Sequence, residues 1–311
     1  MHWHSLIPTF NPPSEIKRLV FAIFLSCLGP MSMQKPHYDV IIVGAGVAGS
    51  SIAHALATLP RERPLQIALV ERSFSEPDRI VGELLQPGGV QALETLGMIS
   101  ALEGIDAIAF SGYLLVEGGD AVRVPYPKGK EGRSFHHGRF ISGLRRVAMQ
   151  NSNIDPIEAT VGDLIECPHT QQVIGVRATS KSTTTTDKAK QSVRVEVNFG
   201  IYGDLVIVAD GCFSNFRNVV MGKASCKATF KSYSVGTILK NAPLPAPRHG
   251  TVIFPQRDGL VFLGQISEHD TRMIIDIQHP LPADLRVSVT SFISGRTYLM
   301  ISTATTDTHT Q

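Results

Sequence analysis

A short glycine-rich segment between two apolar stretches constrains the fold of this chain more than any other feature of its 311 residues. Residues 44–49 read GAGVAG; they follow the apolar run YDVIIV at 38–43 and open the alanine-rich stretch VAGSSIAHALATL at 47–59. A second apolar run, LQIALVE at 65–71, comes after a polar turn. Two buried strands around one helix form a βαβ unit, in which the strands are parallel. The segment therefore predicts an α/β fold with a tight turn between its first strand and first helix.

The spacing of the glycines in this turn fits G-x-G-x-x-G, in the strand–turn–helix context that the pattern requires. Gly44 permits the tight turn, Gly46 lets a pyrophosphate approach the backbone, and Gly49 lets helix and strand pack closely. Free N–H groups at the helix start and the helix dipole favour a phosphate. We predict a Rossmann-like domain that binds an adenine dinucleotide, FAD or NAD(P). An ordinary glycine-rich turn is the alternative.

Two further segments favour FAD, and an acidic residue supports a bound dinucleotide of either kind. Glu71 ends the second strand, about where an acid accepts hydrogen bonds from a ribose hydroxyl. Asp210-Gly211 closes the apolar run LVIVA at 205–209, and an Asp-Gly of this type recurs in flavoprotein monooxygenases. The segment DRIVGELLQPGG at 78–89 places Arg79 where it can meet a phosphate or ribose. A solvated loop is the alternative for these charged residues.

The rest of the chain indicates a second, β-rich part. Apolar runs at 233–239, 251–254, 260–266 and 273–277 predict strands. The polar tract 180–190 predicts an exposed loop at the tip of a hairpin. We predict an N-terminal leader with a short hydrophobic segment at 1–37 and an FAD-binding domain at 38–225, with a hairpin loop near 178–191. A partial β-rich substrate domain at 226–293 is inserted in this domain or follows it, and an atypical polar tail occupies 294–311.

Composition and the N-terminal residues limit the partners that the chain can have. The net charge is +2, from 29 basic and 27 acidic residues, so no nucleic-acid binding is expected. The apolar run LVFAIFLSCLG at 19–29 follows Lys17 and Arg18 and is shorter than the ~20 residues of a spanning helix. It predicts either a leader without further role or a membrane-associating segment. His136 and His137 lack further clustered ligands, so we predict no metal site there.

Taken together, these motifs resemble the squalene monooxygenase (squalene epoxidase) family. The longest matching stretches are EPDRIVGELLQPGGV at 76–90 and GRSFHHGRF at 132–140, which few other flavoproteins would fit. Shorter ones are IIVGAGVAGS, Glu71-Arg72, Gly112-Tyr113, PYP at 125–127 and VADGCFSNFR. They occur in the order of the family and cover roughly residues 38–285.

The resemblance implies an FAD-dependent epoxidase that converts squalene to (S)-2,3-epoxysqualene in sterol (ergosterol) or triterpenoid biosynthesis. Molecular oxygen would be the oxidant, acting through a flavin C4a-hydroperoxide. NADPH-cytochrome P450 reductase would supply the electrons. The expected location is the surface of the endoplasmic reticulum membrane, with lipid droplets as a further site of association.

The resemblance also assigns residues to the adenosine diphosphate half of FAD. Val47 and Ala48 would contact the pyrophosphate through their backbone atoms. Glu71 and Arg72 would hold the adenosine end, and Val161 would meet the adenine.

Other positions are assigned to the flavin and to the reaction. Arg79, Leu84 and Arg139 would line the flavin, and Asp210 belongs to the Asp-Gly motif. Tyr113 corresponds to a tyrosine that the family needs for activity, near flavin and substrate. A strand tyrosine with a satisfied hydroxyl is the alternative for Tyr113.

The chain departs from the family in its C-terminal part. The family's second flavin motif, a Gly-Asp followed by Asn-Met and His-Pro, and its hydrophobic C-terminal helices are not found in the sequence. One alternative is therefore a truncated, non-catalytic flavin-binding fragment. Another is a different class A flavoprotein hydroxylase, which would share the glycine turn but need not share SFHHGRF. A substrate test with squalene against phenolic acids separates the enzymes.

Overall fold

The structure is a computed structural model that describes residues 37–80, 82–186, 191–222, 231–255 and 259–278. From Tyr38 onward the chain forms one compact unit. The apolar run at 19–29 and the tail from 294 lie outside the described residues, as does part of the predicted substrate domain. Among the described helices, none is long and apolar enough to cross a membrane.

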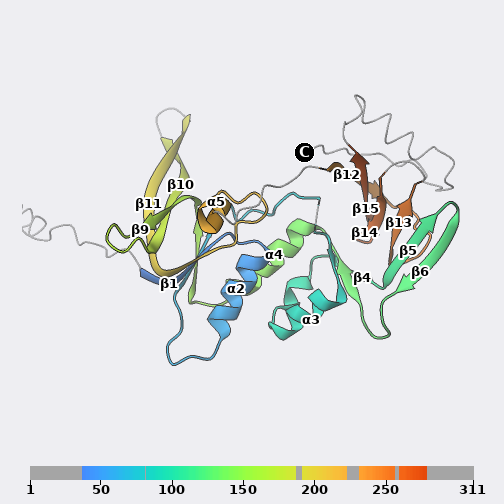
Figure 1. Cartoon of the computed structure of the whole chain (residues 1–311), viewed down its shortest axis with the longest axis horizontal. Coiled ribbons are helices and arrows are strands. Elements are labelled where there is room, and N and C mark those ends of the chain that lie inside the picture. The colour runs from blue at the N-terminus through green and yellow to red at the C-terminus, as the bar shows by residue number, and fades with distance from the viewer. Residues whose placement is uncertain (1–36, 81, 187–190, 223–230, 256–258, 279–311) are drawn as a thin grey trace, which may run out of the picture. The chain divides into compact units, whose positions relative to one another are not determined.

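The first sheet confirms the predicted βαβ unit. It has six strands in the order β8-β2-β1-β11-β10-β9. Figure 1 labels β1, β9, β10 and β11 of this sheet. β1 pairs with β2 in parallel, from Val40 opposite Ile67 to Val43 opposite Val70. The strands are β1 (His37–Val43), β2 (Ile67–Glu71), β8 (Ile154–Glu158), β9 (Thr160–Glu166), β10 (Val173–Thr186) and β11 (Gln191–Val208).

Four α-helices and one 3₁₀-helix are described in this unit. They are α2 (Val47–Thr58), α3 (Pro87–Thr95), α4 (His137–Ala148) and α5 (Arg217–Met221), with the 3₁₀-helix η1 at Ile99–Leu102. Ala53 of α2 and Ala148 of α4 belong to the same buried cluster as Ile42 and Leu69 of the first sheet. α3 ends at Thr95, and Gly97 follows with φ +70°. Glycine adopts this left-handed conformation readily, so it ends the helix there.

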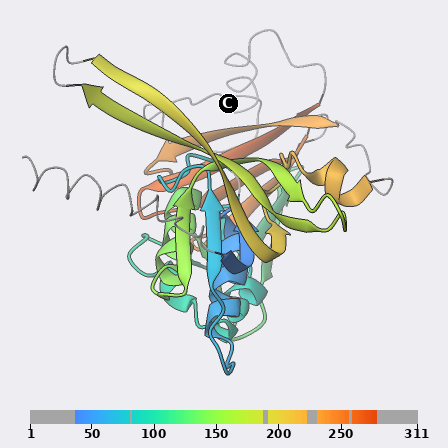
Figure 2. The ribbon, with the colours of Figure 1, turned by 90° about the vertical axis from the view of Figure 1, so that its left-hand side faces the viewer.

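The β10–β11 hairpin is longer than expected. Residues 180–190 were predicted to be a loop, but β10 continues through this tract to Thr186, which lies opposite Gln191. Threonine is β-branched and favours strands, which explains why a polar tract can extend the pairing. β11 is continuous from Gln191 to Val208. Figures 1 and 2 show the hairpin reaching beyond the rest of the first sheet.

The second sheet draws on two separate parts of the chain. Its order is β12-β15-β14-β13-β5-β6. Four strands lie in the segment predicted to be β-rich: β12 (Ser232–Lys240), β13 (His249–Phe254), β14 (Val261–Gln265) and β15 (Asp270–Gln278). The other two, β5 (Gly112–Glu117) and β6 (Asp120–Pro125), come from the segment assigned to the FAD-binding domain. β5 joins through parallel pairing with β13. The domain boundary at 225 stays a prediction.

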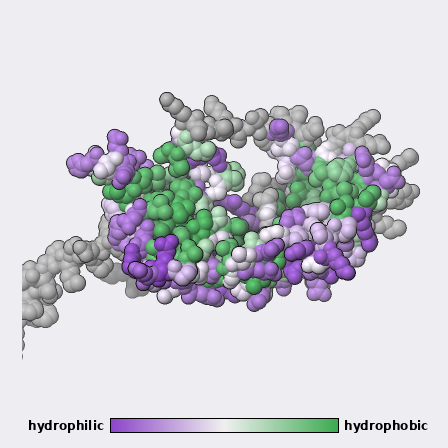
Figure 3. Space-filling model, turned by 60° about the horizontal axis from the view of Figure 1, so that its bottom comes forward, coloured by the Kyte–Doolittle hydropathy of each residue, from purple (hydrophilic) through white to green (hydrophobic). Residues whose placement is uncertain are grey.

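A three-stranded sheet completes the described strands, in the order β3-β7-β4. Its members are β3 (Leu84–Leu85), β4 (Ile108–Phe110) and β7 (Gly132–Ser134). On the face drawn in Figure 3, hydrophobic side chains gather in two areas, with hydrophilic side chains around them.

Candidate active site

The glycine turn lies where β1, β2 and β11 end. Gly44 has φ +100°, and a Cβ there would lie 2.5 Å from the carbonyl oxygen of Ala209. The Ala209 N–H donates to the carbonyl oxygen of Val43 at 2.8 Å. A Cβ on Gly49 would overlap the carbonyl oxygen of Gly44. The turn therefore needs glycine at 44 and 49, and the structure brings Asp210 directly beside it.

The position of Gly46 differs from these two because it faces open space. No described atom lies within 4 Å of where its Cβ would be. Gly46 is the N-cap of α2, and Val47 and Ala48 in the first turn are exposed. The packing of the protein thus does not demand glycine at 46, whereas a ligand approaching the backbone would. The free N–H groups at this helix start fit a pyrophosphate.

Glu71 lies at the end of β2 and contacts the turn directly. Its Oε2 accepts a hydrogen bond from the Ala45 N–H at 2.7 Å. The same oxygen lies 3.6 Å from a guanidinium nitrogen of Arg145. The Arg145 Nε–H donates to the Ala45 carbonyl oxygen at 2.8 Å. Glu71 and Arg145 therefore hold the two peptide groups on either side of Ala45.

Arg145 was not among the sequence-predicted site residues, although it is central to this network. It lies in the last turn of α4 and is buried, whereas its neighbour Arg146 is exposed. It also donates to the Ser75 carbonyl oxygen at 3.1 Å and stacks over the Phe74 ring at 5.5 Å. Burial lowers the pKa of the guanidinium, against the opposing effect of Glu71, but an arginine stays charged in proteins. Its partner Ala45 lies 100 residues away in the sequence, so no local pattern indicates this contact.

The remaining predicted cofactor residues lie in different surroundings. Arg72 and Arg79 are exposed. Arg139 of α4 forms an ion pair with Asp106. Val161 is buried in the core cluster of the first sheet. Their roles toward FAD stay predictions.

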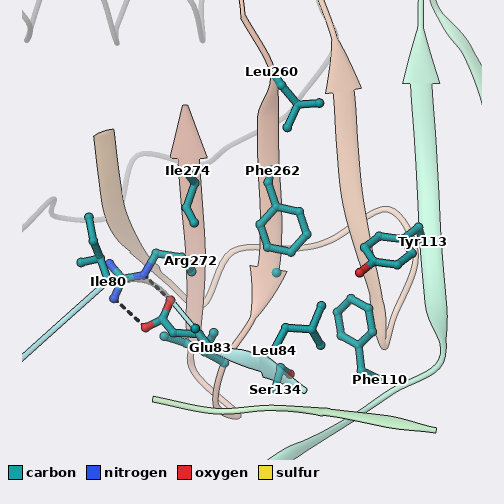
Figure 4. Close-up of a pocket in the computed structure, with 13 residues that line it drawn as sticks. Ile80, Glu83, Leu84, Phe110, Tyr113, Ser134, Leu260, Phe262, Arg272 and Ile274 are labelled. Carbon is teal, nitrogen blue, oxygen red and sulfur yellow. Dashed lines mark hydrogen bonds and ion pairs between the residues drawn. The ribbon is translucent and has the colours of Figure 1, made fainter. Parts of the chain in front are cut away.

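A cavity of about 310 Å³ lies between the second sheet and the segment around β3 (Figure 4). Leu84 and Tyr113, both predicted site residues, line it together with Phe110 and Phe262. Further lining residues are Ile80, Gly82, Glu83, Ser134, Leu260, Gly264, Ile266, Arg272 and Ile274. Most of these side chains are apolar. The cavity therefore suits a hydrocarbon rather than a charged ligand.

Tyr113 belongs to an aromatic cluster at one side of the cavity. Its ring lies 5.5 Å from that of Phe110 and 6.1 Å from that of Tyr126, edge to face in both pairs. The Gln86 side chain joins the two hydroxyls: the Tyr126 O–H donates to Oε1, and Nε2 donates to the Tyr113 oxygen. Burial, with the nearby Tyr113 hydroxyl, raises the pKa of Tyr126. Tyr113 thus accepts from Gln86, and its hydroxyl also interacts with that of Tyr126.

A buried ion pair crosses the wall of the cavity. The Arg272 Nε and Nη2 groups donate to the two carboxylate oxygens of Glu83 at 2.7 and 2.9 Å (Figure 4). Both side chains are 7% exposed. Arg272 is on β15, and Glu83 directly precedes β3. The pair thus fixes the second sheet against the segment that carries Leu84.

A second polar contact is made by the same strand. Asp270 Oδ2 lies 3.0 Å from His136 Nε2, and Oδ1 lies 2.7 Å from Lys240 Nζ. The adjacent His137 uses Nδ1 to contact the Gly82 carbonyl oxygen at 3.2 Å. Across the described ranges, no three His, Cys, Asp or Glu side chains are grouped so as to hold a metal ion.

The environment of Asp270 makes folding stability depend on pH. Burial alone would raise the pKa of the Asp270 carboxyl, but Lys240 and His136 outweigh it and hold the pKa below its ordinary value. Such a carboxyl stabilises the folded chain above its unfolded pKa, and this contribution is lost as the pH falls through the folded value.

We therefore expect Asp270→Asn to reduce the free energy of unfolding at pH 7 and to flatten its decline below about pH 4. Urea unfolding at several pH values measures both. Asp163→Asn, an exposed carboxyl on β9, is the matched control and should follow the unmodified chain. A parallel decline in the Asp270 variant and the unmodified chain would contradict the expectation.

Comparison with known proteins places these features in a family. A family profile described as squalene epoxidase matches residues 202–310, which includes the C-terminal segment from 294. Squalene epoxidase erg1 of Aspergillus fumigatus is 43% identical over 258 residues, covering 79% of this chain and 48% of that protein. Squalene monooxygenase of Mus musculus is 38% identical over 255 residues, covering 80% of this chain and 41% of that protein. The chain thus spans about half the length of the curated relatives it matches.

Solved structures with the same fold are flavoproteins. The myxobacterial chondrochloren halogenase CndH, described as a variant of FAD-dependent halogenases, has a TM-score of 0.62 at 17% identity, covering 83% of this chain and 58% of that chain. PqsL of Pseudomonas aeruginosa, described as a probable FAD-dependent monooxygenase, has a TM-score of 0.58 at 14% identity, with 83% and 64% covered. At 14% and 17% identity these similarities show the fold alone. They confirm the predicted Rossmann-like α/β fold class.

Proposed function

This chain belongs to the squalene epoxidase family, and we propose that it binds FAD and forms part of an FAD-dependent monooxygenase that converts squalene and O2 to (S)-2,3-epoxysqualene. The fold of flavoprotein monooxygenases and halogenases supports the flavin. The names of the relatives support the substrate.

The glycine turn would hold the diphosphate of FAD. Backbone N–H groups of Gly46, Val47 and Ala48 lie at the start of α2, where the helix dipole favours an anion. Glu71 uses Oε2 for the turn itself, so Oε1 is the oxygen through which it would accept from a ribose hydroxyl. When bound, FAD would supply the redox chemistry that activates O2 and transfers one oxygen atom.

The chain's own task in the reaction is to orient the alkene and exclude water. The apolar cavity beside Leu84 would receive a hydrocarbon and keep water from the reacting centre. The hydroxyl of Tyr113 points into this cavity (Figure 4). Gln86 donates to Tyr113 and so holds its hydroxyl in place, where Tyr113 would orient the reacting groups by hydrogen bonding.

The partners and the location follow from the family. NADPH-cytochrome P450 reductase would be the electron donor. The protein would be located at the surface of the endoplasmic reticulum membrane and would also associate with lipid droplets. The product would enter sterol (ergosterol) or triterpenoid synthesis. The apolar cavity is consistent with a substrate drawn from a lipid phase.

The open space at Gly46 is the single observation that carries the proposal. Gly46→Ala should fold, because no described atom contacts the new methyl group and the loss of a glycine N-cap costs under about 1 kcal/mol. It should weaken FAD binding at least tenfold, about 1.4 kcal/mol, because the methyl group occupies the path of the pyrophosphate. Flavin fluorescence titration and the absorbance of the purified protein measure this.

Ala121→Val is the control, since Ala121 is exposed on β6, an edge strand of the second sheet. It should leave FAD affinity unchanged. An unmodified chain that binds no FAD, or a Gly46→Ala variant that binds it equally well, would contradict the proposal. Turnover of squalene with reductase and NADPH then distinguishes an active enzyme from a flavin-binding fragment.

A further inference from the structure

We infer that Arg145 is a positioning residue for the dinucleotide site: it sets the conformation and the charge of the phosphate-binding turn from behind, through Ala45 and Glu71. This inference rests on the proposed FAD binding. It concerns a residue of α4, outside the glycine motif and outside the positions that the family resemblance assigned.

Ala45 is the residue through which Arg145 acts on the turn. Ala45 lies between Gly44 and Gly46 and is fully buried. Its N–H donates to Glu71 at 2.7 Å, and its carbonyl oxygen accepts from Arg145 at 2.8 Å and from the Ser50 hydroxyl at 3.3 Å. With both polar groups of one residue held, the two flanking peptides keep one orientation. The N–H groups that would face the phosphates are thereby oriented before the ligand arrives.

The charge of Arg145 is the second part of the argument. Glu71 bonds to the turn and would bring a full negative charge close to a diphosphate. The guanidinium lies 3.6 Å from Glu71 Oε2, and both side chains are largely shielded, at 7% and 15% exposure. At such burial an ion pair is screened weakly by solvent. Arg145 therefore lets Glu71 hold the turn without repelling the anion.

The shape of the arginine side chain explains why this residue type is needed. The planar guanidinium donates hydrogen bonds to the carbonyl oxygens of Ala45 and Ser75 and forms an ion pair with Glu71. Its face lies over the Phe74 ring. A lysine ammonium has the same charge but lacks the planar arrangement of several N–H donors that lets arginine make these contacts at once. Arg146, the next residue, instead donates to the carbonyl oxygens of Ser100 and Glu103. Arg146 thus offers a control on the same helix.

The test compares Arg145→Met, Arg145→Lys and Arg146→Met in the full chain. FAD and ADP affinities are measured by titration, and amide hydrogen exchange is measured on FAD-free protein. Arg145→Met should lose roughly 10- to 100-fold in affinity for both ligands, the range for losing a charged hydrogen bond. Arg145→Lys should lose less, and Arg146→Met should stay within about twofold of the unmodified chain.

Hydrogen exchange separates positioning from general stability. In both Arg145 variants the Ala45 amide should exchange faster while the Ile42 amide in the middle of β1 does not change. Equal acceleration at Ala45 and Ile42, or FAD affinity unchanged in Arg145→Met, would overturn the inference. If Arg145→Met does not fold, the FAD affinity and the Ala45 exchange rate of Arg145→Lys decide whether the inference holds. If the unmodified chain binds no FAD, the proposed function fails, but the exchange at Ala45 still shows whether Arg145 holds the turn.

Discussion

Replacing Arg272 by methionine is expected to lower the free energy of unfolding by about 3–5 kcal/mol. The substitution leaves the Glu83 carboxylate buried, without the two hydrogen bonds at 2.7 and 2.9 Å that now satisfy it. At 7% exposure, water reaches this carboxylate poorly. Urea unfolding at neutral pH, followed by circular dichroism, measures the loss.

Two further variants test whether the buried pair is the cause. Arg248→Met breaks a pair with Glu131 in which the side chains are 49% and 41% exposed, and such a pair contributes about 0–1 kcal/mol. In the double variant Arg272→Met with Glu83→Leu, no charge is left buried, so much of the stability should return. A single Arg272 variant no less stable than the Arg248 variant would contradict this explanation.

Replacing Gly49 by alanine is expected to have a comparable or larger effect, about 4 kcal/mol or more, or to prevent folding. In a helix, alanine is ordinarily more stable than glycine by roughly 0.5–1 kcal/mol. At position 49 alanine should instead be less stable than glycine, because the new methyl group would overlap the backbone oxygen of Gly44. The clash is with backbone, so a change of side-chain rotamer cannot relieve it.

The measurement for Gly49→Ala is the yield of soluble protein and its thermal unfolding. Gly88→Ala, also in a helix but free of neighbours, should be as stable as the unmodified chain or more so. If the Gly49→Ala variant unfolded at the same temperature as the unmodified chain, helix α2 and the turn would be able to move apart, contrary to the structure.

The sequence predicts those parts of the site in which neighbours along the chain determine the geometry. The strand–turn–helix around Gly44–Gly49 is of this kind, since Gly44 and Gly49 meet the backbone constraints that the motif implies and Gly46 leaves the space open. Parallel pairing of β1 with β2 follows from two apolar runs joined by a helix. Asp210 could be assigned to the same site because Asp-Gly at a strand end recurs in flavoproteins.

Features that depend on distant partners could not be predicted in this way. Arg145 is buried against residues far from it in the sequence, such as Ala45 and Ser75. The Arg272–Glu83 pair likewise joins residues 189 apart. Which buried side chains meet is decided by packing between elements, and local periodicity does not specify which elements pack together. The strand extension to Thr186 depends equally on its partner strand.

The parallel pairing of β5 with β13 has a consequence for how the chain folds during synthesis. Tyr113 lies opposite Gly250, and the place of a Cβ on Gly250 is 2.7 Å from the ring of Phe110. The cavity, which Phe110 and Tyr113 line together with Phe262 and Ile274, therefore cannot be completed until the ribosome has released residues beyond 274. Contacts so distant in sequence form slowly. The nucleotide turn can be assembled earlier, so nascent chains should acquire a cofactor site before they acquire a cavity for the hydrocarbon.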